Sequence, residues 1–130
     1  MARLILDTTA LVDAERTAGT LGRLIDDEDD VAIAAITVAE LVVGIELADE
    51  ARRSRRAAFV QRILGAVPVE DYDVPVATEH ARLLAHVRRT GRPRGAHDLI
   101  IAATAAARDR VIVSSDATAF DGLPGVRVRT

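Results

Sequence analysis

The stretch RLILDTTAL, residues 3–11, places an apolar run directly before an aspartate and two threonines. The run Leu4–Leu6 has no polar alternation, which is typical of a short strand buried on both faces of a parallel sheet. We therefore predict a strand at Arg3–Leu6, with Asp7 at its carboxyl end and a helix after it. Ligands of open α/β sheets bind outside the carboxyl ends of the strands, so Asp7 is the first candidate functional residue.

Other short apolar segments extend this pattern along the chain. Strands are predicted at Val31–Ala34, Val111–Val113 and Val126–Val128, with a weaker candidate at Ala66–Val69. Helical patterns occur at Ala10–Glu15, Thr20–Ile25, Val38–Leu47, Ala57–Leu64, Pro75–Arg89 and Ala96–Ala107. Strands that alternate with helices predict an α/β fold, a three-layer sandwich with a central, mainly parallel sheet.

The composition restricts the chemistry that the chain can perform. A length of 130 residues predicts one domain over residues 1–130. The sequence has no cysteine, which excludes thiolate metal sites and a cysteine nucleophile, and its 17 basic residues are all arginine, which excludes a catalytic lysine. The net charge of -3 does not by itself indicate a nucleic-acid-binding protein. No apolar stretch approaches the roughly 20 residues of a membrane span, so we expect a cytoplasmic protein with no membrane partner.

Four acidic residues lie where predicted elements meet, and each also has an ordinary structural explanation. Asp7 and Asp116 follow predicted strands and are suited to cap the segments after them. Glu40 follows Thr37 by three residues, which is the capping-box pattern of a helix start. Asp98 lies in the first turn of the most apolar predicted helix, where an acid complements the helix dipole. Its apolar neighbours should leave it partly buried, and a buried carboxylate needs a partner.

A metal site explains these four acids together. The predicted topology brings them to the carboxyl edge of one sheet, where two carboxylates ~4 Å apart would repel by about 4 kcal/mol at an effective dielectric of 20. A bound cation would remove this repulsion and the upward pKa shifts that it causes. Oxygen donors without histidine or cysteine at ligand spacing favour Mg²⁺ or Mn²⁺ over zinc. Such a metal activates water for attack on a phosphodiester, so the four acids predict a phosphodiesterase.

At this point the chain resembles a known family. The blocks LILDTTAL, ITVAELVVGI, GRPRGAHDLIIAATA and VIVSSDATAFDGLPGVRV are similar, in order and spacing, to the four signature blocks of PIN domains, above all those of the VapC-class toxins. The resemblance spans Arg3 to Val128 and implies a PIN-like fold and Mg²⁺-dependent cleavage of RNA, with Mn²⁺ as a substitute. It implies that Asp7, Glu40 and Asp98 match the family's invariant acids and that Asp116 matches its more variable fourth position.

Two hydroxyl residues and one substitution complete the predicted site. Thr9 matches the family's small hydroxyl residue after the first aspartate, and we assign it a supporting role together with Ser114. Many relatives have an acid directly before the phenylalanine of the last block, where this chain has Ala119 before Phe120. We therefore expect Asp116 to reach the metal through a water molecule.

The basic residues and histidines have weaker signals. Arg92 and Arg94 lead into the loop before Asp98 and are weak candidates for binding RNA phosphates. A second basic run is interpreted as a solvated helix face and comprises Arg52, Arg53, Arg55 and Arg56. His97 would point about 100° away from Asp98 on a helix, so we interpret it as structural.

Three functions other than a ribonuclease are compatible with parts of this pattern. A phosphoacceptor receiver domain requires a lysine that the chain lacks, and a haloacid-dehalogenase-type phosphatase requires an aspartate where the chain has Thr9. A catalytically silent PIN module that only binds a partner remains open, although it would be expected to lose acids.

Partners follow from the resemblance, which implies a cognate antitoxin in addition to the RNA substrate. We predict a homodimer in which helices at Ala10–Glu15 and Val38–Glu50 offer an apolar groove to an antitoxin segment. The sequence does not indicate which RNA is cleaved.

Overall fold

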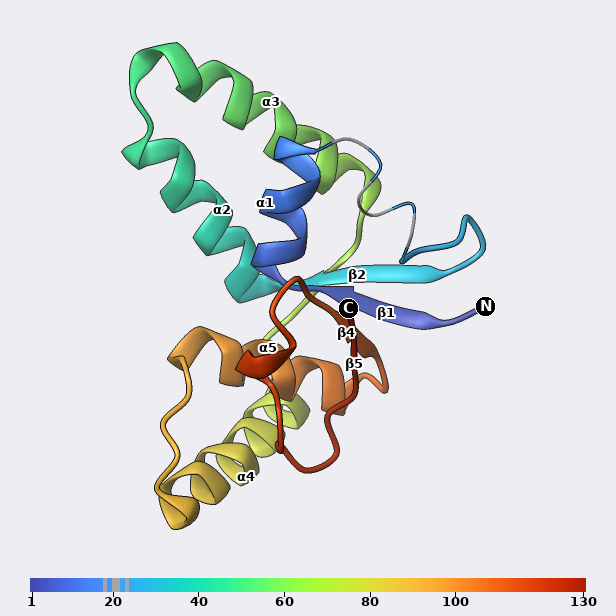
Figure 1. Ribbon diagram of the computed structural model, residues 1–130, viewed down its shortest axis with the longest axis vertical. Helices are drawn as coiled ribbons and strands as arrows, with labels where there is room; N and C mark the ends of the chain where they lie inside the picture. Colours follow the sequence, from blue (N-terminus) through green and yellow to red (C-terminus); the bar gives the residue numbers. More distant parts are fainter. Residues whose placement is uncertain (18, 20–21, 23) are drawn as a thin grey trace.

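The computed structural model describes residues 1–17, 19, 22 and 24–130 of the chain. Figure 1 shows a central sheet with helices on both sides. The strands are β1 (Arg3–Leu6), β2 (Asp30–Ala34), β3 (Val69–Glu70), β4 (Val111–Val113) and β5 (Val128–Arg129). The helices are α1 (Thr8–Arg16), α2 (Ala35–Leu47), α3 (Glu50–Ala66), α4 (Val74–Thr90) and α5 (Ala96–Ala107), followed by the short 3₁₀ helix η2 (Ala117–Ala119).

The sheet has the order β3-β2-β1-β4-β5, and each neighbouring pair is parallel. β1 lies in the centre, with Ile5 opposite Ala32 of β2 on one side and Ile112 of β4 on the other. The chain therefore adds β2 and β3 on one side of β1, and then β4 and β5 on its other side. The carboxyl ends of β1, β2 and β4 consequently meet at one edge of the sheet.

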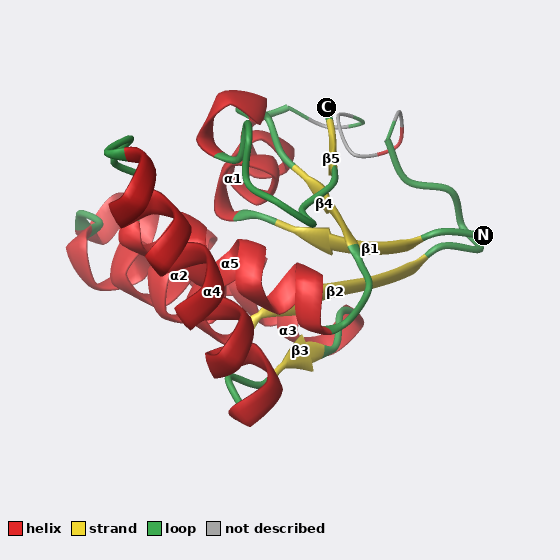
Figure 2. Ribbon diagram, turned by 90° about the horizontal axis from the view of Figure 1, so that it is seen from below, coloured by secondary structure: helices red, strands yellow, loops and turns green. Residues whose placement is uncertain are grey.

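Successive residues of β1 enter two different cores, which is why the fold has three layers. Ile5 packs in a buried cluster with Leu83 of α4 and Leu99 of α5. Leu4 and Leu6 pack in the other cluster, against residues of α1, α2 and α3. Alternate side chains of a strand point to opposite faces, so α4 and α5 cover one face while α1, α2 and α3 cover the other (Figures 1 and 2). The predicted α/β sandwich with a parallel sheet is confirmed.

Most element boundaries lie within a few residues of the predicted ones. β1, β4 and α5 have the predicted bounds, whereas α2 begins at Ala35 instead of Val38, directly after β2. α3 extends back to Glu50 because the Asp49 carboxylate accepts a 2.9 Å hydrogen bond from the backbone N–H of Arg52, which caps the helix. The helix predicted at Thr20–Ile25 includes residues 20, 21 and 23, which lie outside the described residues.

The two edge strands, β3 and β5, are shorter than predicted and displaced toward the C-terminus. β3 covers Val69–Glu70 where the sequence predicted Ala66–Val69, because α3 continues to Ala66. β5 covers Val128–Arg129 where Val126–Val128 was predicted, because the N–H of Val126 still bonds to Leu123 in the preceding turn.

Arg110 connects three strands at the amino edge of the sheet, opposite the candidate site. Its side chain is 5% exposed, and its Nη1 donates to the carbonyl oxygens of Leu4 at 3.1 Å and Asp30 at 2.9 Å. Nη2 lies 3.0 Å from Oε1 of Glu70 in β3. The buried guanidinium thus attaches the two-residue strand β3 to the centre of the sheet.

No helix in the described part of the chain is long and apolar enough to cross a membrane.

Candidate active site

A pocket of about 410 Å³ opens at the carboxyl edge of the sheet. The four predicted acids all line it: Asp7, Glu40, Asp98 and Asp116. Asp7 follows β1 directly, Glu40 is on α2, Asp98 is in the first turn of α5 and Asp116 follows β4. The fold therefore brings together, from four separate segments, the residues that the sequence singled out.

Asp7 is the most deeply buried of these acids, with 2% of the residue exposed. Its Oδ1 accepts hydrogen bonds from the backbone N–H of Ala10 at 2.9 Å and from the Thr9 hydroxyl at 2.8 Å. Its Oδ2 accepts a 2.5 Å hydrogen bond from Ser114, which is also buried. Asp7 therefore caps α1, as its ordinary structural explanation predicted, while Thr9 and Ser114 fix the carboxylate at the pocket.

Glu40 does not form the capping box that its spacing from Thr37 predicted. α2 begins at Ala35, so both residues lie inside the helix and Glu40 is in its second turn. Its Oε1 accepts a 2.7 Å hydrogen bond from the hydroxyl of Thr8 on α1. Its Oε2 lies 3.4 Å from Nδ1 of His97 on α5. Glu40 is thus positioned by side chains on α1 and α5 and not by the start of its own helix.

Asp98 is half-buried in the first turn of α5, as the apolar sequence around it predicted. Burial raises the pKa of this carboxyl, and the negative charges of Asp7, Glu40 and Asp116 raise it further. His97 acts in the opposite direction and lowers the pKa. Burial is the main cause of this rise, and the neighbouring acids add a charge repulsion that a bound cation would relieve.

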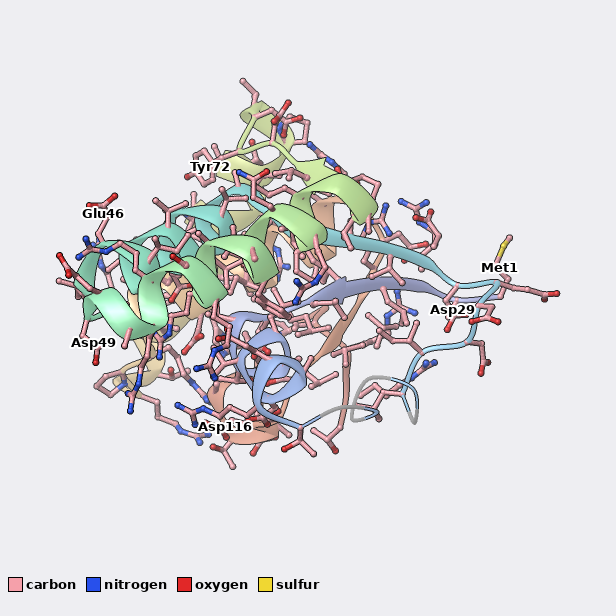
Figure 3. The ribbon with its side chains drawn as sticks, turned by 90° about the horizontal axis from the view of Figure 1, so that it is seen from above. Met1, Asp29, Glu46, Asp49, Tyr72 and Asp116 are labelled. Carbon is pink, nitrogen blue, oxygen red and sulfur yellow. The ribbon has the colours of Figure 1, made fainter. Side chains whose placement is uncertain are left out.

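Asp116 is exposed and has a hydrogen-bonding role in its own loop. Its Oδ1 accepts from the backbone N–H of Thr118 at 3.1 Å and from the Thr118 hydroxyl at 2.5 Å, so it caps η2. Figure 3 labels Asp116 on the side of the molecule where α1 lies beside the loop after β4. The cap and the pocket position coexist, because capping uses Oδ1 and no hydrogen bond within the described residues engages Oδ2.

A family model described as PIN domain matches residues 4–125. The chain belongs to the PIN domain family.

Relatives of this PIN domain include VapC ribonucleases. It is 35% identical over 98 residues to the tRNA(fMet)-specific endonuclease VapC of Salmonella typhimurium, which covers 74% of this chain and 71% of the relative. It is 33% identical over 132 residues to ribonuclease VapC5 of Mycobacterium tuberculosis, covering 95% and 92%. A DNA-bound VapBC structure from Salmonella typhimurium superposes with a TM-score of 0.88 at 27% identity, covering 99% and 98%. The resemblance to the VapC class that the sequence blocks predicted is confirmed.

The donor set of this PIN domain suits a hydrated magnesium ion. Among the described residues, no three histidine, aspartate or glutamate side chains come together as a group that could hold a metal ion. Mg²⁺ does not require such a group, since it keeps several water ligands and binds through one or two carboxylates. The raised pKa of Asp98 fits the same reading, because a divalent cation would stabilise the charged carboxylates.

Sequence reasoning missed several residues in or beside the carboxylate pocket of this PIN domain. His97, interpreted as structural, lies close enough to Glu40 to bind it when protonated. Asp13 and Arg16 line the pocket from α1, and Asp13 accepts a hydrogen bond from the hydroxyl of Ser115. Helical spacing was the available signal for α1, because a helix that starts at Thr8 places positions 9, 13 and 16 on one face.

Neither of the two arginines proposed to bind substrate lines the carboxylate pocket. Arg94 donates hydrogen bonds to the carbonyl oxygens of Thr118, at 2.6 Å, and Asp121, so it holds the loop that contains η2. Arg92 lies beside it in a small hollow at the end of α4. These contacts assign Arg94 to support of the loop after Asp116, and a contact of either arginine with RNA stays a prediction.

Proposed function

We propose that this PIN domain is a Mg²⁺-dependent endoribonuclease that acts as the toxin of a toxin–antitoxin pair, with residues 1–130 as one nuclease domain. The observation that carries the proposal is that Asp7, Glu40, Asp98 and Asp116, from four separate segments, line one pocket at the carboxyl edge of the sheet. Such a cluster is unfavourable unless a cation occupies it. The VapC relatives, which are named as ribonucleases, support RNA as the substrate.

Asp7 and Asp98 are the proposed direct metal ligands, with Glu40 and Asp116 completing the site. Bound Mg²⁺, or Mn²⁺ in its place, would supply a water activated for attack on the phosphodiester and would offset the charge that develops on phosphate. The protein's own part is to hold the acids in place. Thr9 and Ser114 fix both oxygens of Asp7, and Thr8 and His97 fix those of Glu40.

A cognate antitoxin is the proposed protein partner. The solved VapBC-5 structure from Mycobacterium tuberculosis is named as a member of a family of toxin–antitoxin systems, which supports an antitoxin for this chain. On α2, Val43 is 52% exposed and Leu47 is 82% exposed, four residues apart on one side of the helix. We propose that this apolar surface belongs to a homodimer with an antitoxin segment in its groove, in the cytoplasm where the RNA substrate is found.

The test is to sequence new RNA 5′ ends after induced expression of the protein, beside Asp98→Asn as the control. We expect new ends with the wild type and none with Asp98→Asn, and the purified protein should lose cleavage in excess EDTA and regain it on addition of Mg²⁺. The alternative, a catalytically silent module, predicts no new ends with either protein. Cleavage at an unchanged rate in EDTA would disprove the metal mechanism.

A further inference from the structure

The carboxylate pocket and two further hollows form a row beside α1. Neighbouring hollows in this row share lining residues. Arg16 and Glu40 line both the carboxylate pocket and a second hollow of about 190 Å³ between α1, α2 and α3. Arg16 and Arg56 line that second hollow and also a third, of about 290 Å³, on the surface of α3. We call the second and third hollows together the α1/α3 trough. The trough is therefore continuous with the carboxylate pocket.

The charged residues of the α1/α3 trough are mostly basic, unlike the carboxylate pocket. Its lining includes one acid other than Glu40, Glu15, and the following arginines: Arg16, Arg52, Arg55 and Arg56. Arg52, Arg55 and Arg56 are three and four residues apart on α3, which places them on one face of the helix. Arg16 joins them from the last turn of α1.

These guanidinium groups are not neutralised by neighbouring acids. Arg16 and Arg55 make no ion pair or hydrogen bond with any described residue. Nε of Arg52 lies 3.9 Å from the exposed carboxylate of Asp49, and Arg56 donates a 3.3 Å hydrogen bond to a backbone carbonyl. In contrast, Arg108 and Arg110, on the far side of the sheet, each contact two carboxylates. The arginines of the trough are thus available to an anionic ligand.

We propose that the α1/α3 trough binds the phosphate backbone of the RNA strand that enters the carboxylate pocket, which deepens the proposed function and rests on it. Arginine forks bind phosphate oxygens in pairs of parallel hydrogen bonds, and a row of arginines suits a chain of phosphates. The scissile phosphate lies at the acids and the flanking phosphates lie on α3. The arginines of the trough would offset the repulsion between the acids of the pocket and an anionic strand.

The contacts in the trough are to the backbone and not to bases. Bases bind without sequence readout by stacking on aromatic rings, and the chain has only Phe59, Tyr72 and Phe120. Both phenylalanines are buried, and the hydroxyl of Tyr72 pairs with His80 of α4. The trough therefore contributes affinity that depends on salt and not on base sequence.

The decisive comparison is between two double variants of α3 that remove the same charge. Arg52→Gln/Arg55→Gln changes two exposed arginines of the trough, and Arg53→Gln/Arg62→Gln changes two exposed arginines of the same helix that do not line it. Both are made in the Asp98→Asn background, and binding of a fluorescein-labelled, 12-nucleotide single-stranded RNA is measured by anisotropy from low to high salt. Each lost phosphate contact lowers the slope of log affinity against log salt by about 0.7 on a single strand, so two contacts lower it by about 1.4.

We expect this decrease for the trough variant and a smaller one for the control. Equal slopes for the two variants would overturn the proposal. These arginines would then be candidates for contact with a protein partner instead of RNA. Cleavage is measured separately in the Asp98 background, on a dinucleotide that reaches only the carboxylate pocket and on the 12-nucleotide RNA. The trough variant should cleave the dinucleotide as the wild type does and have a raised KM for the longer RNA. If the wild type cleaved neither RNA, the proposed function would be contradicted. The binding comparison would still decide the role of the trough.

Discussion

The hydroxyl of Ser114, at the end of β4, donates a 2.5 Å hydrogen bond to Oδ2 of Asp7, at the end of β1, and both residues are at most 2% exposed. This bond connects two neighbouring strands at the point where the pocket begins. It also leaves Asp7 with both oxygens engaged, since Thr9 and Ala10 donate to Oδ1. The orientation of the proposed metal ligand therefore depends on a residue that does not itself bind metal.

Ser114→Ala should weaken metal binding without unfolding the protein. Loss of a hydrogen bond to a metal-ligating carboxylate costs about 10–100-fold in metal affinity or activity. We expect the Mg²⁺ concentration for half-maximal cleavage to rise in that range, with maximal cleavage largely restored at high Mg²⁺. Ser115→Ala is the matched control, because Ser115 is exposed and donates to Asp13 instead. Equal metal requirements for the two variants would contradict the role of Ser114.

Two substitutions of Asp7 should separate its structural and chemical roles. Charge repulsion alone predicts that Asp7→Ala keeps or gains stability, but the structure shows that Asp7 caps α1. Loss of such a cap costs about 0.5–2 kcal/mol, whereas asparagine caps as well as aspartate. In urea unfolding we therefore expect Asp7→Ala to be less stable than Asp7→Asn, with both inactive. An Asp7→Ala protein as stable as Asp7→Asn would show that the cap contributes nothing.

Asp98 should make the metal-free protein less stable at neutral pH. An acid whose pKa is higher in the folded chain than in the unfolded chain loses folding free energy when it ionises. The cost is present above the folded pKa and disappears as the pH falls toward the ordinary value of 3.8. Because Asp98 is only half-buried, solvent screens the repulsion, and we expect Asp98→Asn to gain about 0.5–1 kcal/mol near neutral pH. The gain should vanish below pH 4, as measured by thermal unfolding in EDTA; a gain independent of pH would exclude charge repulsion as its cause.

Where burial pattern alone determines an element, the sequence predicted the structure closely. The apolar run of β1 and the largely apolar sequence of α5 gave correct bounds, because apolar segments of this kind are stable only when they are buried. Glu40 shows the opposite case. Its spacing from Thr37 indicates a helix start, yet β2 leads into α2 without a loop, and Thr37 is fully buried inside the helix. Tertiary packing therefore determines where α2 begins, and the spacing of residues along the sequence does not predict it.

The acidic residues of the site could be predicted from the sequence, but the contacts between its side chains could not. Acids after predicted strands pointed to Asp7 and Asp116, because parallel strands share one edge, and an acid in the most apolar helix pointed to Asp98. The contact between His97 and Glu40 depends on how α5 lies against α2, and the availability of the α3 arginines to an anion depends on which acids lie near them in space. Neither relation is local in sequence, so a charge run in α3 looked like any solvated helix face.

Arg110 should be required for stability and not for cleavage. Arg110→Met keeps the length of the side chain but leaves the carbonyl of Leu4 without the donor described above, and it removes the link to Glu70. A hydrogen bond that involves a charged group contributes about 1.5–3 kcal/mol, so we expect a loss in this range in urea unfolding. Arg127→Met is the control, since its ion pair with Asp109 is exposed and should contribute less than about 1 kcal/mol. Reduced cleavage by folded Arg110→Met protein would contradict this separation of the two sheet edges.

Asp116 both caps η2 and lines the carboxylate pocket. Its Oδ1 caps η2, and Ala119 stands where the resemblance to the VapC class implied a further acid. We therefore expect Asp116 to reach the metal through water, using the oxygen that the cap leaves free. Asparagine preserves the capping oxygen and removes the charge, so Asp116→Asn tests the charge without disturbing the loop.

The expected result is a graded series measured as cleavage rate across a Mn²⁺ titration. Asp7→Asn and Asp98→Asn should be inactive at every Mn²⁺ concentration, because they remove proposed direct ligands. Asp116→Asn should lose about 10–100-fold and recover as Mn²⁺ is raised, as expected for a group that acts through water. Thr118→Ala, which removes the hydroxyl partner of Asp116 but no charge, is the control for a loosened loop. Wild-type rates for Asp116→Asn throughout would reduce Asp116 to a cap, and complete loss without rescue would make it a direct ligand.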